Sequence, residues 1–301
     1  MEKCRGPSPD NQIAIRTEVI REMKFELVSQ EEVSVSFGNG YKEVFKCDGE
    51  NDSFWDNPTR IEKLENEQVY EVSNIEGNCQ TNAWNRWKSI LEQQNNEIEC
   101  LVFEFGITEN PQLYNYHPSL PSKVVDCHSL VITGKPNAWL TFPVVQFMKP
   151  KIDSLYVYQI GYPYNLSTGF GRMEQVKTAR KLYCTVAMEK EDVLELEGED
   201  ISVDPLYFYH FFGKEILKKS IETGNPKKFR VFRGGKFLEG VLRGLEFSLW
   251  TNEIKKKYDF EYQIFPGCKC FLVWDPNNSR RLFVEFSNGR QDVWGCILNE
   301  K

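Results

Sequence analysis

Two segments near opposite ends of the chain match each other closely, and this match constrains the fold more than any other feature. Residues 35–47 read VSFGNGYKEVFKC and residues 284–296 read VEFSNGRQDVWGC, and they align without a gap. Each copy has Asn-Gly between alternating apolar residues, which is the strongest short signal for a β-hairpin. Candidate strands at 24–28 and 270–274 precede the copies, so we expect a small antiparallel meander at each end. Two explanations of the match stay open: duplication of a module, or the pattern that unrelated hairpins share.

The shared pattern V-x-F-x-N-G-x-x-x-V resembles the strand–turn–strand of Tudor-like, SH3-like small β-barrels, at residues 24–47 and 270–297. This resemblance implies modules that bind methylated arginine or lysine in an aromatic cage, or that use the barrel as a docking surface. Neither copy has the aspartate and tyrosine that many Tudor domains carry around this turn. The aromatic residues that the resemblance offers for a binding surface are Phe37, Tyr41 and Phe45 in the first copy and Trp274, Phe286 and Trp294 in the second.

Apolar periodicity and capping residues predict about three helices. Their expected ranges are 81–97, 205–223 and 238–257. In the first helix, Trp84 and Trp87 fall on one side, and we interpret them as residues that pack the helix against a sheet. For the second helix, we expect Asp204 to be the N-cap and Pro205 the first helical residue.

Short apolar segments between prolines predict further strands in the middle of the chain. Their expected ranges are 100–107, 123–133, 139–148, 155–160 and 181–188. The predicted fold class is therefore α+β and β-rich, with antiparallel barrel-like sheets. The predicted division is a disordered start at 1–12, an N-terminal β-rich domain at 13–150, and a C-terminal α+β domain at 151–301 that ends in the Tudor-like meander.

The charge is distributed unevenly around a formal net charge of −7. Residues 205–257 hold twelve Lys or Arg against five Glu, whereas residues 189–204 hold eight acidic residues against one lysine. Within the basic part, residues 227–237 read KKFRVFRGGKF, so that cations alternate with aromatic rings on a strand. Cations near exposed rings are typical of single-strand nucleic-acid binding. The cations of this candidate site are Lys227, Lys228, Arg230, Arg233 and Lys236. Two alternatives are a solvated basic face and a patch that pairs with the acidic stretch.

The sequence holds little that predicts catalysis. The chain has three histidines and a Cys268-x-Cys270 pair, but no nucleotide-binding or metalloprotease motif. We therefore expect neither a metal site nor a cofactor. Glu104, in the segment LVFEFGI, resembles the metal-binding acid on the first strand of RNase H-like nucleases. The same strand and the histidines that follow it resemble the RNA-binding RNase H-like domain of Maelstrom proteins. A metal-dependent hydrolase centred on Glu104 and His128 is a third reading.

Nine scattered cysteines, no secretory signal and no long apolar run indicate a reduced cytoplasmic or nuclear protein without a membrane segment. We therefore expect a non-enzymatic interaction or scaffold protein with Tudor-like modules, which acts in a ribonucleoprotein or chromatin assembly. Its expected partners are proteins, with RNA as a further candidate. The alternative function is a single-stranded RNA-binding or degenerate RNase H-like protein that uses the basic segment 227–237.

Overall fold

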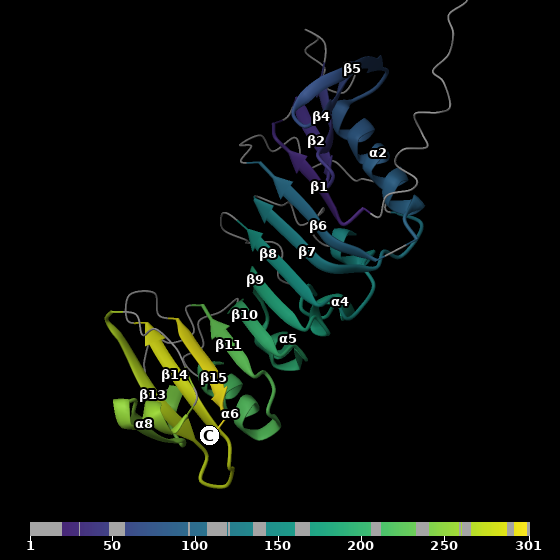
Figure 1. Ribbon diagram of the computed structural model, residues 1–301. Coiled ribbons are helices and arrows are strands. Elements are labelled where there is room, and N and C mark those ends of the chain that lie inside the picture. The colour runs from purple at the N-terminus through teal and green to yellow at the C-terminus, as the bar shows by residue number, and fades with distance from the viewer. Residues whose placement is uncertain are drawn as a thin grey trace, which may run out of the picture.

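Strand-forming segments from both halves of the chain join into one elongated sheet of fifteen strands, which we describe from a computed structural model (Figure 1). The structure describes residues 20–29, 31–47, 58–95, 97–106, 119, 121–134, 143–159, 169–205, 212–232, 241–258, 260, 266–287 and 292–299. The strand order is β12-β13-β14-β15-β11-β10-β9-β8-β7-β6-β1-β2-β3-β4-β5.

The strands are β1 (Glu22–Leu27), β2 (Glu32–Phe37), β3 (Tyr41–Cys47), β4 (Thr59–Glu65), β5 (Gln68–Ile75), β6 (Ile98–Phe105), β7 (Cys127–Gly134), β8 (Ser154–Gln159), β9 (Lys181–Met188), β10 (Asp200–Pro205), β11 (Lys228–Val231), β12 (Glu246–Leu249), β13 (Cys268–Trp274), β14 (Arg281–Ser287) and β15 (Val293–Leu298). The helices are α2 (Cys79–Gln93), α4 (Glu174–Lys177), α5 (Lys190–Glu195), α6 (Phe212–Thr223) and α8 (Asn252–Lys257).

The middle of the sheet is a block of parallel strands formed by β1 and β6 to β11. From β6 to β11, strands that follow each other in the chain are also neighbours in the sheet, and they begin 29, 27, 27, 19 and 28 residues apart. One row of buried residues runs across all six strands in register: Leu101, Leu130, Leu155, Leu182, Ile201 and Phe229. One strand and its return therefore form a unit that stacks on the next, as in solenoid proteins.

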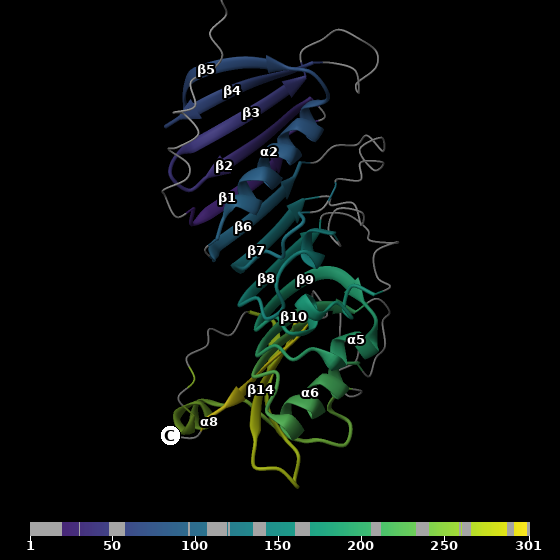
Figure 2. The same ribbon diagram turned by 90° about the vertical axis from the view of Figure 1, so that its right-hand side faces the viewer.

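The helices α2, α4, α5 and α6 lie along one face of this sheet (Figures 1 and 2). Helix α2 begins at Cys79 because Asn78 caps it, with Oδ1 accepting hydrogen bonds from the backbone nitrogens of the next turn. The rings of Trp84 and Trp87 lie 5.5 and 6.4 Å from Phe25 of β1. The prediction of a helix at 81–97 that docks through its tryptophans is therefore confirmed, with bounds shifted toward the N-terminus.

The C-terminal end of the sheet is covered on both faces. Helix α6 lies on the same side as α2, whereas α8 lies on the opposite side (Figure 2). A second, smaller core forms beneath the α8 region, from Tyr258, Cys270, Leu272, Phe283 and Leu298. The ring of Trp250 packs edge-on against Phe283 at 4.8 Å and extends this core.

The two predicted meanders exist, but they are not barrels. Strands β2–β5 form one antiparallel end of the sheet and β12–β15 form the other, with the parallel block between them. The β-rich α+β class is confirmed, whereas the prediction of small antiparallel barrel-like sheets was wrong. The sheet also continues across residue 150, because β7 pairs in parallel with β8. The predicted disordered start at 1–12 lies outside the described residues.

Several predicted elements are replaced by others. Asp204 and Pro205 end strand β10 instead of starting a helix, and the described helix begins at Phe212. Its predicted end is confirmed, since Gly224 has a φ of +77° just after the last turn. The range 238–257 contains β12 and the short α8 in place of one long helix, and residues 143–146 are helical where a strand was expected.

The two copies of the repeated segment differ in register. In the first copy Phe37 pairs with Tyr41 across the Asn-Gly turn, where Gly40 has a φ of +83°. In the second copy the equivalent Phe286 pairs with Val293, which is three residues further along than the first copy would place its partner. A shift by an odd number of residues moves every later side chain to the other face of the sheet. Equivalent side chains of the two copies therefore point to the same face of the sheet before the turn and to opposite faces after it.

Candidate functional site

The aromatic residues expected to form binding surfaces are mostly internal. Phe37, Phe45 and Phe286 are buried in the main core, on the face that the helices cover. Trp274 and Trp294 pack against the second core on the opposite face of the sheet. Phe286 therefore cannot share a cage with these tryptophans, because the sheet separates their rings.

Tyr41, the remaining residue of the expected surface, has a structural partner. Its hydroxyl donates a 2.6 Å hydrogen bond to Glu43 Oε1, and Arg86 of α2 donates to both oxygens of the same carboxylate at 2.8 to 3.2 Å. Burial, and then the charge of Glu43, raise the pKa of Tyr41 well above its ordinary value. This network fixes α2 on the N-terminal meander.

The basic segment is only partly a free basic surface. Lys228 and Arg230 lie on one face of β11 while Phe229 and Val231 are buried on the other, as the alternation predicts. Lys227 pairs with Glu199 at 2.9 Å, and Arg230 pairs with Asp292 at 2.9 Å. The expected pairing with the acidic stretch 189–204 is thus present at Lys227. Arg233 and Lys236 lie outside the described residues.

The residues considered for metal chemistry have other close partners. Glu104 accepts from Lys24 at 2.6 Å, and His128 Nε2 lies 3.4 Å from Asp153 Oδ2. Within the described part of the chain, no group of three His, Cys, Asp or Glu side chains could hold a metal ion. Cys268 and Cys270 are in β13, and Cys270 is buried there.

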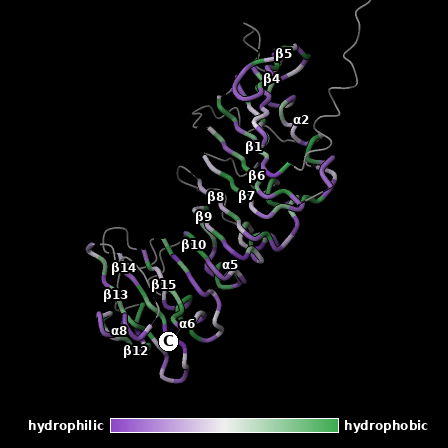
Figure 3. The backbone as a smooth tube through the Cα atoms, in the orientation of Figure 1, coloured by the Kyte–Doolittle hydropathy of each residue, from purple (hydrophilic) through white to green (hydrophobic). Residues whose placement is uncertain are grey.

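The sheet face opposite α2, α4, α5 and α6 carries a cluster of stacked aromatic residues on the parallel block. Side chains alternate along each strand, so that hydrophobic and hydrophilic residues follow one another (Figure 3). The row next to the buried leucine row is Val102, Val131, Tyr156, Tyr183, Ser202 and Arg230, and it points away from the main core. Register alone therefore brings residues from β6 to β11 together on one surface.

We call Tyr156, Tyr158, Tyr183, Phe232 and Arg230 the tyrosine cluster. Tyr156 and Tyr183 stack with ring centroids 4.4 Å apart and planes within 8°, and Tyr158 lies 6.5 Å from Tyr156. Phe232 meets Tyr183 edge-on at 5.7 Å, and the Arg230 guanidinium lies 5.0 Å from the Phe232 centroid. The cluster is partly accessible, since Tyr158 is 40% exposed and its other members are half-buried.

A charged pair lies beside the tyrosine cluster. Glu104 of β6 is in register with Tyr158 through Thr133 of β7, and its carboxylate pairs with Lys24 at 2.6 Å. Burial, and then the neighbouring Tyr156, raise the pKa of Tyr183, so its phenol stays protonated at neutral pH. An aromatic centre with a polar border and hydroxyl donors is typical of interaction surfaces.

Sequence reasoning missed this cluster, although a signal for it was present. The Leu-x-apolar pattern recurs in three triplets, which are LVF beginning at Leu101, LYV beginning at Leu155 and LYC beginning at Leu182. The middle residue of each triplet lies on the uncovered face, and in two of the three it is a tyrosine. A search for internal repeats near 27 residues would have aligned these triplets.

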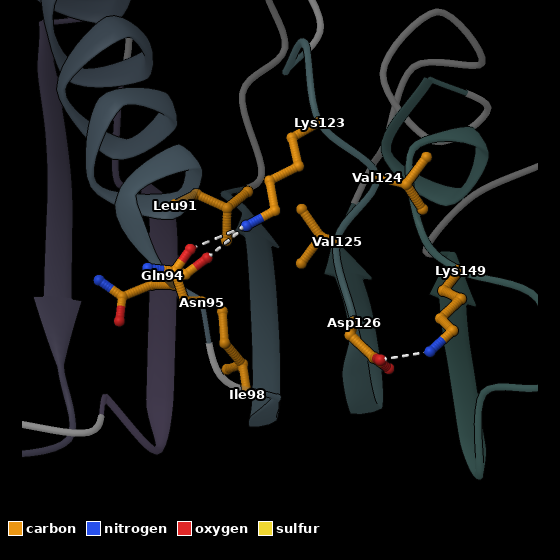
Figure 4. A pocket seen from close by; sticks show the side chains of 9 residues that line it. All are labelled: Leu91, Gln94, Asn95, Ile98, Lys123, Val124, Val125, Asp126 and Lys149. Atoms are coloured by element: carbon orange, nitrogen blue, oxygen red, sulfur yellow. Dashed lines mark hydrogen bonds and ion pairs between the residues drawn. The ribbon is translucent and has the colours of Figure 1, made fainter.

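A pocket of about 400 Å³ lies elsewhere, where the end of α2 meets the starts of β6 and β7 (Figure 4). Its two lysines are engaged: Lys123 donates to Gln94 O at 2.9 Å, and Lys149 pairs with Asp126 at 2.6 Å. The pocket is at the amino ends of the parallel strands, whereas α/β sheets usually bind ligands at the carboxyl ends. The tyrosine cluster is therefore the stronger candidate site.

None of the described helices is long and apolar enough to span a membrane. Comparison with known proteins adds no relative: no family model, no curated protein and no solved structure matches the chain.

Proposed function

We propose that this chain is an interaction protein, without a catalytic role, that binds a partner protein on the tyrosine cluster. The observation that carries the proposal is the run of contacting rings from β8 through β9 to β11, on a part of the sheet face over which no described helix lies. Tyrosine and arginine are enriched among the residues that dominate binding energy in protein interfaces.

The strands that hold the tyrosine cluster keep its side chains in fixed positions, which favours recognition by a rigid surface. Tyr156 and Tyr183 are held on neighbouring parallel strands whose other faces bury Leu155 and Leu182 in the main core. Side chains on such strands lose little conformational entropy when a partner binds, because their positions are already fixed. A tyrosine adds a large apolar area and one hydroxyl with few rotatable bonds.

The test compares partner recovery by three forms of the full chain. In the double variant Tyr158→Ala/Tyr183→Ala, we expect proteins that co-purify with the wild type after ribonuclease treatment to fall at least tenfold in quantitative mass spectrometry. The control Phe247→Ala removes a ring that is 50% exposed on β12, far along the sheet, and should leave recovery unchanged. Circular dichroism checks that each variant folds. Equal recovery by wild type and double variant would contradict the proposal.

Single-stranded RNA is a second candidate ligand of the same surface. Its support is the exposed Lys228 next to Arg230 on β11, since cations beside stacked rings suit a strand of nucleotides. The ion pair of Arg230 with Asp292 reduces the positive charge that a phosphate would meet. A ribonucleoprotein role would follow from this candidate.

The RNA candidate predicts binding of a labelled single-stranded RNA that weakens steeply between 50 and 200 mM salt. Lys228→Glu/Arg230→Glu should abolish the binding, whereas Lys255→Glu/Lys256→Glu on α8 is a matched charge control. Absence of binding at the lower salt concentration would reject this candidate and leave the protein-binding proposal in place.

A further inference from the structure

Strand β5 ends the sheet and offers an edge without a strand partner among the described residues. It is eight residues long, and β4 pairs with it along one side only. Its apolar residues are unusually accessible, with Val69, Tyr70, Val72 and Ile75 between 39 and 53% exposed. Long apolar edges invite pairing with another strand, and natural proteins usually protect them with lysine or proline. Neither residue occurs in β5.

The surroundings of this edge are acidic at both ends. Glu65 and Glu67 lie at the β4–β5 turn, and Glu76 follows the last residue of β5. All three side chains are exposed, and no described cation forms an ion pair with them. In the middle, Glu71 pairs with Lys63 of β4 at 2.7 Å and is thereby neutralised. The edge thus has exposed carboxylates at both ends and exposed apolar side chains in its centre.

We propose that β5 binds an extended basic segment of a partner protein by β-strand addition. Main-chain hydrogen bonds to the free edge would provide affinity, and side chains of the added strand would provide specificity. The arrangement favours alternating apolar residues in the centre, opposite Val69 and Val72, and Lys or Arg at both ends. Strand β5, which separates the two acidic ends, is about 24 Å long, at 3.4 Å per residue of strand. This edge is separate from the tyrosine cluster, which lies on the face of β8–β11.

A second copy of the chain is a poorer occupant of this edge. Antiparallel pairing of β5 with the β5 of another copy would place the acidic ends Glu65–Glu67 and Glu76 side by side, and like charges directly opposite are destabilising. The opposite edge, β12, is only four residues long and therefore offers half the length for pairing. Charge thus favours a basic partner over self-association.

The probe is a fluorescein-labelled peptide with a centre of alternating Val and Thr and two Lys at each end. We expect the full chain to bind it in fluorescence anisotropy, at least tenfold more tightly than the same peptide with Glu at the ends. Affinity should fall as salt is raised from 50 to 300 mM, since exposed charges are screened. Methylation of alternate backbone nitrogens should abolish binding when it blocks one edge of the peptide and not when it blocks the other. Equal binding of the two methylated peptides would overturn strand addition.

Two pairs of substitutions locate the site. Val69→Ser/Val72→Ser should weaken binding at least tenfold, whereas Phe247→Ser/Leu249→Ser at the β12 edge should change it less than twofold. The methylated peptides report on the wild type, so the test survives a variant that fails to fold. No binding of the basic peptide, or loss only in the β12 variant, would overturn the proposal. Self-association in sedimentation velocity that Val69→Ser/Val72→Ser removes would also overturn it, because the occupant would then be a second copy. None of these outcomes depends on the tyrosine cluster.

Discussion

The two ends of the sheet begin from similar sequences and are packed differently. At the N-terminal end, β2–β4 are covered by α2 on one face, and the other face of this meander carries the ion pairs of Glu62 with Lys46 and Arg60. At the C-terminal end, β12–β15 are covered by α6 on one face and by the α8 region on the other. The difference shows that a shared hairpin pattern does not determine what packs on it.

The aligned residues Phe45 and Trp294 illustrate the cause. Phe45 is 1% exposed on the face that α2 covers, whereas Trp294 packs against Phe260 on the face that α8 covers. The three-residue difference in register across the turn separates them. Since side chains in a strand alternate with a period of two, an odd shift exchanges the two faces.

Each end also has a buried carboxylate paired with an arginine, and the largest predicted effect is the loss of Arg86. Arg86→Ala would leave Glu43, only 1% exposed, without its cation. We expect the free energy of unfolding to fall by about 3 kcal/mol in urea titrations followed by circular dichroism. The control Arg60→Ala, which removes an arginine that is 47% exposed, should change it by less than about 0.5 kcal/mol. Equal effects would mean that α2 is not held by this pair.

The second prediction concerns Gly295, which is opposite Phe229 in the β11–β15 pair. A Cβ at this position would lie 2.2 Å from Phe229 Cζ, so Gly295→Ala forces a core ring to move. We expect a loss of about 2 kcal/mol. The matched change Lys46→Ala, at the aligned position of the first copy, should cost less than about 1 kcal/mol. A neutral Gly295→Ala would contradict the packing described for the C-terminal end.

The ion pair at the C-terminal end should contribute less than its N-terminal counterpart. Arg230 donates one hydrogen bond, at 2.9 Å, to Asp292, whereas Arg86 holds both oxygens of Glu43. Arg230→Ala is therefore expected to cost about 1.5 kcal/mol in the same titrations. A cost above that of Arg86→Ala would reverse the comparison.

The smallest predicted effect is a pH dependence at the N-terminal end. The hydrogen bond from Lys46 holds the pKa of Glu62 below its ordinary value. The contribution of this hydrogen bond to the free energy of unfolding is thus complete above the unfolded pKa of about 4.3, and is lost as the pH falls through the lower folded pKa. We expect Glu62→Gln to be less stable than the wild type by under about 1 kcal/mol at pH 6. The difference should shrink toward pH 2.5, and a difference that grows on acidification would contradict the assignment.

The sequence predicted local elements better than their arrangement. The range 181–188 is a strand with the predicted bounds, and helix α2 was recognised from Trp84 and Trp87, because the period of apolar residues is a local property. The parallel order of β6–β11 was missed, since pairing depends on contacts between residues far apart in the chain. Pro205 was wrongly assigned to a helix start. Proline suits the first position of a helix but is also tolerated at the end of a strand, so this residue alone does not distinguish the two.

The candidate site was harder to predict than the fold. The alternation that places Lys228 and Arg230 on one face of β11 could be read from residues 227–232 alone. The neighbours that turn this strand into a site, Tyr156 and Tyr183, come from positions far earlier in the chain and meet Phe232 only through the sheet. The resemblance of the hairpins to Tudor-like barrels led to Phe37, Phe45 and Phe286, which are buried in the main core.

The most direct test of the central claim places a photocrosslinking amino acid at Tyr158 in the full chain. If the tyrosine cluster binds a partner protein, irradiation in cells should give a discrete, ribonuclease-resistant protein adduct at this position. The same amino acid at Phe247, on the β12 edge, should not give that adduct. A lack of any protein adduct at Tyr158, or adducts that ribonuclease removes, would contradict the account.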